Sequence, residues 1–139
     1  MIEINLERKE GDFGFEATDT AGHTMRLDSN PENGGVNFGI RPMQAILMAL
    51  GGCSGIDIVS ILNKQRQEVK GFKMKITGER EKDKEPSLWE DVHLVFELTG
   101  DIDHAKAQRA VELSMDKYCS VAETIRRAGA KITWEVKVM

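Results

Sequence analysis

The stretch at 41–66, RPMQAILMALGGCSGIDIVSILNKQR, constrains the fold of this chain more than any other. Pro42 suits the first turn of a helix, where its missing N–H costs nothing, and residues 45–50 are all apolar. Apolar residues dominate again at 56–62, before polar and cationic residues end the stretch. An apolar surface on every side is typical of a helix that is buried all round. We therefore predict one long central helix here.

Gly51 and Gly52 precede Cys53 in the middle of that helix. Each glycine inside a helix costs about 1 kcal/mol relative to alanine, so we expect the pair to serve a purpose. The missing side chains would admit either a closely packed backbone or a small molecule that must reach the cysteine. A free cysteine is also commonly a small buried hydrophobe. The helix alone leaves both interpretations of Cys53 open.

Length and charge limit the classes of protein to which the chain can belong. A chain of 139 residues predicts a single domain over residues 1–139. The 19 basic residues are interleaved with 23 acidic ones, which argues against binding nucleic acid. No signal peptide is recognisable, and the longest apolar run is far shorter than the roughly 20 residues that span a bilayer. We expect a cytoplasmic protein with no membrane partner, whose two cysteines are reduced at rest.

The periodicity of the remaining chain predicts strands and two further helices. Alternating apolar and polar residues predict strands at 2–6, 13–17, 23–27, 72–76, 92–98 and 132–138. A helical stripe follows Asp103, and a short helix follows Cys119. This order predicts an α+β fold with an antiparallel sheet of about six strands packed on the central helix and a second helix. Such a sheet covers one side of an all-apolar helix, so we predict a homodimer in which a second copy covers the other.

The surroundings of Cys119 indicate a reactive thiol. Ser120 and Glu123 have the spacing of a capping box, which places the cysteine directly before a helix N-terminus. The positive end of the helix dipole favours a thiolate there, so we expect a lowered thiol pKa.

Four segments, together with the order of elements, resemble the OsmC/Ohr family over nearly the whole chain. They are ALGGCSGIDIVSIL, VKGFKMKITGER, LTGDIDHAKAQRAVELS and YCSVAETI. The resemblance implies an OsmC-like fold, an intertwined homodimer and a thiol peroxidase that reduces organic hydroperoxides. It also implies that Cys53 is the peroxidatic cysteine and Cys119 the resolving one, joined by an intramolecular disulfide during turnover. No cofactor is expected beyond an external dithiol reductant, and the expected role is antioxidant, in an oxidative stress response.

The chain departs from the family pattern at the start of the central helix. Well-characterised peroxidases of the family have a glutamate after the helix-start proline, whereas Pro42 is followed by Met43 and Gln44. That glutamate orients an arginine that supports the thiolate, so the chain resembles a branch that lacks this residue. The candidates for the arginine are Arg8, Arg26 and Arg41.

Asp57 lies one helical turn after Cys53, on the same face of the central helix. A carboxylate there would raise the thiol pKa and slow attack unless it is paired with a cation. Asp57 could instead hold the missing arginine, or serve as a polar residue at an interface or as a cap. The sequence leaves these roles open.

A second class of function is a non-catalytic binding module. In this alternative, a dimeric apolar cavity beside Gly51 and Gly52 holds a hydrophobic small molecule, and the cysteines are incidental. The enzyme requires the two sulfurs to lie close together, whereas the binder does not. No metal site is expected, because the three histidines share no ligand spacing with each other or with the cysteines.

Overall fold

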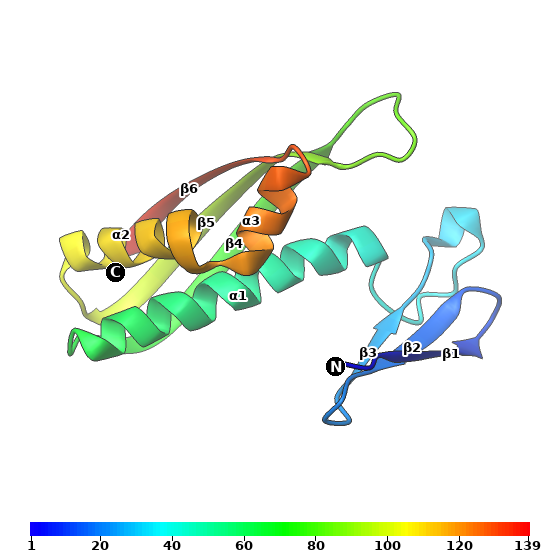
Figure 1. Ribbon diagram of the computed structural model, residues 1–139, viewed down its shortest axis with the longest axis horizontal. Helices are drawn as coiled ribbons and strands as arrows, with labels where there is room; N and C mark the ends of the chain where they lie inside the picture. The colour runs from blue at the N-terminus through cyan, green and yellow to red at the C-terminus, as the bar shows by residue number, and fades with distance from the viewer. The chain divides into compact units, whose positions relative to one another are not determined.

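The computed structural model describes residues 1–139, and the chain forms two compact units, residues 1–48 and residues 49–139. The units contain two three-stranded sheets and three α-helices, which confirms the predicted α+β class (Figure 1). The expectation of a single domain over 1–139 stays a prediction.

The first unit contains the predicted meander of three antiparallel strands, but its first strand lies at 5–10 and not at 2–6. They are β1 (Asn5–Glu10), β2 (Gly14–Thr18) and β3 (Thr24–Leu27), in the order β1-β2-β3. Leu6 pairs with Ala17, and Ala17 pairs with Met25, so the three residues form one row across the sheet. Leu6 remains 56% exposed and Met25 44% exposed, so this row is not covered within the first unit.

The loop that leads from β3 to the long helix is organised by the buried side chain of Asp28. Its carboxylate accepts hydrogen bonds from the backbone N–H groups of Ser29, Val36 and Phe38, at 2.7, 2.9 and 3.1 Å. These bonds, of which that from Val36 has the largest effect, hold the pKa of Asp28 below its usual range. The long loop, which includes a short 3-10 helix at Pro31–Asn33, is therefore ordered around one carboxylate.

The second unit contains most of the long helix, a three-stranded sheet and two shorter helices. The long helix α1 spans Pro42–Lys64, and the strands are β4 (Glu68–Arg80), β5 (Trp89–Asp101) and β6 (Lys131–Val138). Between β5 and β6 lie α2 (His104–Leu113), a π-helical turn at Ser114–Tyr118 and α3 (Ser120–Arg127). Figure 1 shows α2 and α3 lying over this sheet together with α1.

The arrangement of the strands differs from the expected antiparallel sheet in two respects. The six strands form two sheets of three, and β6 runs parallel to β5, whereas β4 and β5 form an antiparallel hairpin. The parallel pairing arises because α2 and α3 carry the chain back to the beginning of β5, as a helical crossover does.

The core of the second unit lies between β5 and the helices. Every second side chain of β5 is buried, as its alternation predicted: Val92, Leu94, Phe96 and Leu98. The helices meet them with Leu50, Ile58 and Leu62 of α1 and with Ala107, Ala110 and Val111 of α2. This packing fixes α1 and the segment after α2 relative to one another, and so positions the residues described below.

The opposite side of α1 remains open within the chain. Ile56 is 74% exposed, and by length and composition alone α1 could cross a membrane, with a mean hydropathy of 2.0 over 18 residues. Glycines and serines interrupt the apolar run of α1 without adding charge. The length of the uninterrupted run is therefore a poor measure of how apolar the whole helix is. A core helix passes the same test, and the absence of a membrane partner stays a prediction.

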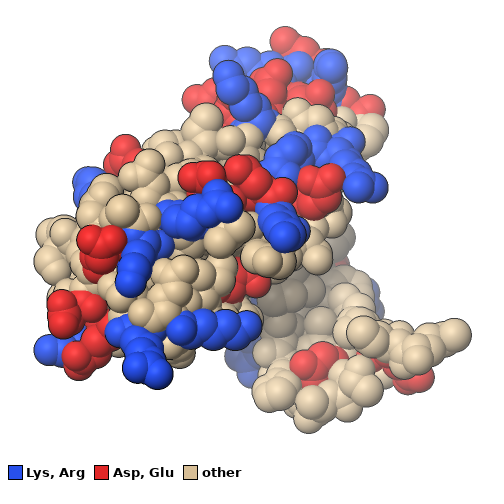
Figure 2. Space-filling model, turned by 60° about the vertical axis from the view of Figure 1, so that its left-hand side comes forward, with Lys and Arg blue, Asp and Glu red and all other residues tan.

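The charged residues on the surface are mixed in sign. Figure 2 shows Lys and Arg side chains interspersed with Asp and Glu over the face in view, as the interleaved sequence predicts. No basic patch of the kind that follows a nucleic-acid backbone stands out on that face.

Candidate thiol site

The fold brings Cys53, Asp57 and Cys119 together in the second unit. The two Sγ atoms and a carboxylate oxygen of Asp57 all lie within 4.8 Å of one another. Cys53 and Asp57 come from one face of α1, and Cys119 lies between the π-helical turn and α3. Both cysteines are free, Cys53 half-buried and Cys119 only 3% exposed. Residues distant in sequence thus form one dithiol and carboxylate cluster.

Two glycines of α1 allow β4 to approach the helix beside this cluster. A Cβ on Gly51 would lie 2.9 Å from Cδ1 of Ile76, and one on Gly55 would lie 2.7 Å from Cε of Met74. A Cβ on Gly52 would meet nothing within 4 Å. Close packing therefore explains Gly51, whereas nothing in the chain requires a glycine at Gly52.

The sulfur of Cys119 caps the N-terminus of α3. The N–H of Ala122 donates to Cys119 Sγ at 3.3 Å, and the N–H of Cys119 donates to the carbonyl of Ser114 at 2.8 Å. These two bonds hold the cysteine at the junction of the π-helical turn and α3.

The expected capping box at Ser120 does not form. Glu123 instead pairs with Arg126 at 2.7 Å and with Arg127 at 2.9 Å, within α3. The carboxylate therefore faces cations of its own helix, and the N-cap lies one residue earlier than predicted, at Cys119.

The expected lowering of the Cys119 thiol pKa is wrong. Burial, followed by the hydrogen bond and charge of Cys53, raises the pKa of Cys119 to about 11, although the N–H of Ala122 and the hydroxyl of Ser54 lower it. The desolvation of the thiolate outweighs the favourable end of this short helix. Cys119 is therefore a protonated thiol at neutral pH.

The carboxylate of Asp57 is held by Ser114. Ser114 Oγ donates to Asp57 Oδ2 at 2.9 Å, and Asp57 forms no ion pair within the second unit. No cation of the second unit is therefore paired with Asp57. Sequence reasoning missed Ser114 as a site residue. The available signal was a polar residue on the apolar stripe of α2 and its continuation, which must find a partner when it is buried.

The arginines singled out in the sequence lie in the first unit. Arg26 pairs with Glu16 at 3.7 Å, and its guanidinium lies 4.8 Å from the ring centroid of Phe38. Arg41 donates to the carbonyl of Gly39 at 3.0 Å and to Oδ1 of Asn37 at 3.4 Å.

The other candidates lie at the start of α1 and in β1. Met43 is half-buried and Gln44 is exposed, both in the first turn of α1, and Arg8 is exposed in β1. Any role of these residues and of the two arginines above in supporting the Cys53 thiolate stays a prediction.

Comparison with known proteins decides the family. A family model described as OsmC-like protein matches residues 32–135. The chain belongs to the OsmC-like family. The resemblance stated from the sequence is confirmed, and so is the OsmC-like fold.

Several relatives of this OsmC-like protein exceed 30% identity. Protein YhfA of Escherichia coli K12 is 42% identical over 115 residues, which cover 82% of each chain. The crystal structure of a hypothetical protein from Aquifex aeolicus VF5 is 31% identical with a TM-score of 0.83, covering 100% of this chain and 98% of that one.

An organic hydroperoxide resistance protein, OsmC from Legionella pneumophila, has the same fold. It is 18% identical to the OsmC-like protein with a TM-score of 0.74, and the alignment covers 99% of this chain and 97% of that one.

Two open grooves border the face of α1 in the OsmC-like protein. One, of about 550 Å³, is lined by Asp57 and Ile61 of α1 together with Leu113 and Tyr118, and so gives access to the carboxylate of the cluster. The other, of about 640 Å³, lies between α1 and β4. Its lining contains no cation: Gly51, Gly52, Gly55, Ile56, Val59, Ser60, Asn63, Phe72 and Met74.

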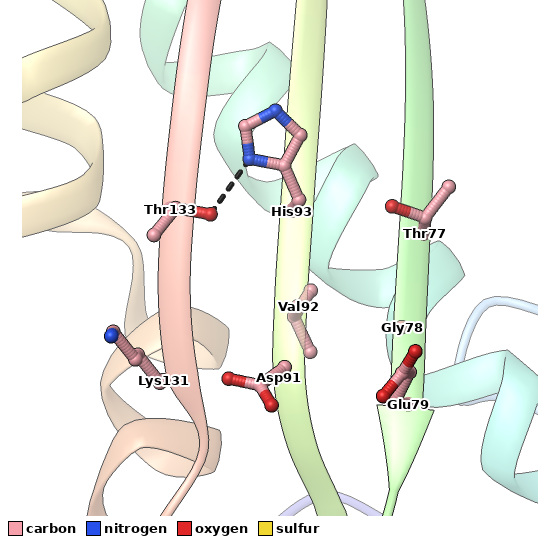
Figure 3. A pocket seen from close by; sticks show the side chains of 8 residues that line it. All are labelled: Thr77, Gly78, Glu79, Asp91, Val92, His93, Lys131 and Thr133. Carbon is pink, nitrogen blue, oxygen red and sulfur yellow. Dashed lines mark hydrogen bonds between the residues drawn. The ribbon is translucent and has the colours of Figure 1, made fainter.

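A third hollow lies on the outer face of the second sheet, away from the cluster. In Figure 3 the side chain of His93 points to Thr133, and its Nδ1 lies 2.7 Å from Thr133 Oγ1. Thr77 stands opposite His93 on the neighbouring strand. The side chains of this row alternate with the buried ones of β5, so they face away from the helices that carry the cysteines.

Proposed function

We propose that this OsmC-like protein is a thiol peroxidase that reduces organic hydroperoxides, with Cys53 as the peroxidatic cysteine and Cys119 as the resolving one. The observation that supports this most directly is the approach of the two free sulfurs to within 4.8 Å. A disulfide requires about 2.05 Å between the sulfurs, so the proposed reaction needs the two side chains to close the remaining gap.

The surroundings of the two thiols support this division of roles. Cys53 is half-buried and so accessible to a substrate, whereas Cys119 is almost fully buried. The raised pKa of Cys119 keeps its sulfur protonated at neutral pH, and a protonated thiol is a poor nucleophile toward peroxide. Cys119 would react only once an electrophilic sulfur stands beside it.

The proposed reaction has three steps. The Cys53 thiolate attacks the terminal oxygen of the hydroperoxide, the O–O bond breaks, and a sulfenic acid and an alcohol form after the alkoxide takes a proton. The sulfur of Cys119 then attacks the sulfenic sulfur, an S–S bond replaces the S–O bond, and water leaves with the thiol proton. An external dithiol reduces the disulfide by exchange and is itself oxidised.

Asp57 would assist the second step. Its carboxylate oxygen lies within 4.8 Å of both sulfurs, and the hydrogen bond from Ser114 fixes its orientation. Because the pKa of Cys119 is raised, its proton needs an acceptor as the sulfur attacks. We assign that acceptor role to Asp57.

The groove beside Asp57 favours an organic substrate. Ile61, Leu113 and Tyr118 supply apolar surface along it, which would bind the carbon skeleton of an organic hydroperoxide but gains nothing from hydrogen peroxide. A peroxidase with this preference would protect a cytoplasm under oxidative stress.

A homodimer would cover the apolar faces that each unit leaves open. These faces are the row of Leu6 and Met25 on the first sheet and the side of α1 that carries Ile56. A second copy is the simplest cover, in agreement with the intertwined homodimer that the family resemblance implies.

One observation favours the alternative of a non-catalytic binding module for a hydrophobic small molecule. The groove beside Gly51 and Gly52 is apolar, and no arginine or lysine lines it. A ligand held there would not need either cysteine.

A stopped-flow titration separates the two functions. Reduced protein is mixed with cumene hydroperoxide or, separately, with hydrogen peroxide, and free thiols are counted before and after. The peroxidase predicts rapid loss of both thiols with the organic peroxide and no loss in a Cys53→Ser variant. A Cys119→Ser variant should stop at a sulfenic acid that dimedone traps. Survival of both thiols in excess cumene hydroperoxide would rule out the peroxidase.

A further inference from the structure

The cluster of Cys53, Asp57 and Cys119 combines three metal-ligating groups, and no cation of the second unit forms an ion pair with its carboxylate. The two sulfurs lie within 4.8 Å of the Asp57 carboxylate, whose hydrogen-bond donor is the neutral hydroxyl of Ser114. We propose that the reduced protein binds one zinc ion per chain through Cys53 Sγ, Cys119 Sγ and an Asp57 carboxylate oxygen. This site goes beyond the proposed peroxidase and does not depend on it.

The donor atoms are close to the spacing that zinc requires. Tetrahedral zinc with Zn–S of about 2.3 Å and Zn–O of about 2.1 Å places its ligands about 3.6 to 3.8 Å apart. The donors here lie within 4.8 Å of one another, so a contraction of about 1 Å closes the site. Cys53 and Asp57 are half-buried on a single helix face, which leaves their side chains room to make that movement.

Neighbouring groups already orient two of the three ligands. Ser114 donates to Asp57 Oδ2 at 2.9 Å, leaving the other carboxylate oxygen available to a metal. The N–H of Ala122 donates to Cys119 Sγ at 3.3 Å. Outer hydrogen bonds of this kind hold ligands in place and strengthen metal affinity.

The ligand types and the access path indicate which ion would bind. Two cysteine sulfurs, which lose their protons when the metal binds, select a thiophilic ion such as zinc over magnesium or calcium. Asp57 borders an open groove, which provides an entry path and room for water as the fourth ligand. Three protein ligands with an open position form a labile site, not a closed structural one.

Zinc and a hydroperoxide would compete for the same sulfurs. Oxidation of the two bound thiolates to a disulfide gives two electrons to the hydroperoxide, which takes two protons and leaves as alcohol and water. The disulfide sulfurs no longer carry the charge that holds zinc, so the ion is released. The sequence predicted no metal site because its histidines lack ligand spacing. This cluster contains no histidine, because its donors are two cysteines and an aspartate.

The test is a zinc titration of the reduced, untagged, full-length chain against a chromophoric chelator. We expect one zinc per chain with a submicromolar dissociation constant, and at least tenfold weaker binding in Cys53→Ser, Cys119→Ser and Asp57→Asn. The matched control is Asp116→Asn, an exposed carboxylate in the neighbouring π-helical turn, which should bind as the wild type does. Cobalt in place of zinc should give sulfur-to-metal charge-transfer absorption that is lost in Cys53→Ser.

The outcomes decide between a built site and adventitious binding. Unchanged affinity in Asp57→Asn and Cys53→Ser, or the absence of thiolate absorption with cobalt, would overturn the proposal. Circular dichroism of each variant shows whether it folds. If loss of the α3 cap makes Cys119→Ser unstable, the zinc affinity of Asp57→Asn still tests the proposal. Zinc binding without peroxide turnover would support the zinc site and overturn the peroxidase. Peroxide turnover without zinc binding would support the peroxidase and overturn the zinc site.

Discussion

Ser114 Oγ donates a 2.9 Å hydrogen bond to Asp57 Oδ2, and this bond joins two segments 57 positions apart beside the two cysteines. Ser114 is fully buried, so its hydroxyl must find a partner inside the protein. Asp57 in turn owes its orientation to this bond, because no cation of the second unit pairs with it. The pair therefore links the packing of the second unit to the chemistry of the thiol site.

Replacing Ser114 with alanine tests this link. We expect Ser114→Ala to lower the free energy of unfolding by about 1 to 2 kcal/mol, because a part-buried carboxylate loses its hydrogen-bond donor. The resolving step should also slow, because Asp57 is no longer held beside Cys119. Urea denaturation and the rate of disulfide formation after a peroxide pulse measure the two effects. Ser60→Ala, an exposed serine on the same helix, is the control and should change neither.

The raised pKa of Cys119 predicts the pH dependence of its reaction with iodoacetamide. With a pKa of about 11, about a thousandth of the thiol is ionised at pH 8. In a Cys53→Ser chain the burial of Cys119 remains, so its alkylation rate should still rise beyond pH 9. A plateau below pH 8 would show that the helix N-terminus dominates after all.

The same pKa has a consequence for stability. The folded pKa lies above that of an exposed thiol, about 8.5, so burial of the neutral thiol stabilises the fold fully below that pH. This contribution is lost as the pH rises through 8.5 toward 11. Denaturation midpoints of wild type and Cys119→Ala should therefore converge over that range.

Gly51 and Gly52 should respond differently to alanine. At Gly52 a Cβ meets nothing within 4 Å, so the better helix propensity of alanine should stabilise the monomeric fold by up to about 1 kcal/mol. At Gly51 the Cβ lies 2.9 Å from Cδ1 of Ile76, so the repacking should cancel that gain. Denaturation of both variants at low protein concentration gives the free energy of unfolding of each monomer. Equal stabilisation would contradict the close packing of β4 against α1.

Asp28 predicts acid sensitivity of the first unit. Its pKa is lowered by backbone hydrogen bonds, so the ionised carboxylate stabilises the loop above the ordinary carboxyl pKa of 3.8. This contribution is lost as the pH falls below that value through the lowered pKa. Asp28→Asn should therefore reduce stability at pH 7, and its difference from wild type should shrink in acid. Asp12→Asn, in the exposed turn between β1 and β2, is the control and should lack this pH dependence.

Local periodicity was enough to predict the strands and the central helix, but not the features that depend on tertiary structure. The alternation at 92–98 became β5, because burial of one face imposes that pattern, and the apolar stretch at 41–66 became α1, although one side of this helix is exposed. The parallel pairing of β6 depends on how α2 and α3 return the chain, which no local pattern encodes. The thiol pKa of Cys119 was mispredicted because the burial of Cys119 depends on distant residues.

The site was predictable to a similar degree. Family resemblance singled out Cys53 and Cys119, and helical spacing singled out Asp57, so the three members of the cluster were named from the sequence. Ser114, the partner of Asp57, was not predicted as a site residue, because it belongs to a helical stripe that predicts packing alone. Sequence spacing did not single out one arginine as the partner of the thiolate. In the structure, Arg26 and Arg41 each have a local partner in the first unit.

The exposed face of α1 predicts the effect of a charge on assembly. Ile56 is 74% exposed in the chain, so Ile56→Lys should leave the stability of the monomer nearly unchanged. If a second copy covers this face, the same change buries an unpaired charge at the interface and should dissociate the dimer. Light scattering coupled to size-exclusion chromatography gives the mass of each variant. Leu88→Lys replaces an exposed leucine before β5 and should keep the wild-type mass. An Ile56→Lys protein that remains dimeric would place the interface elsewhere, and a monomeric wild type would leave the apolar groove open for a ligand.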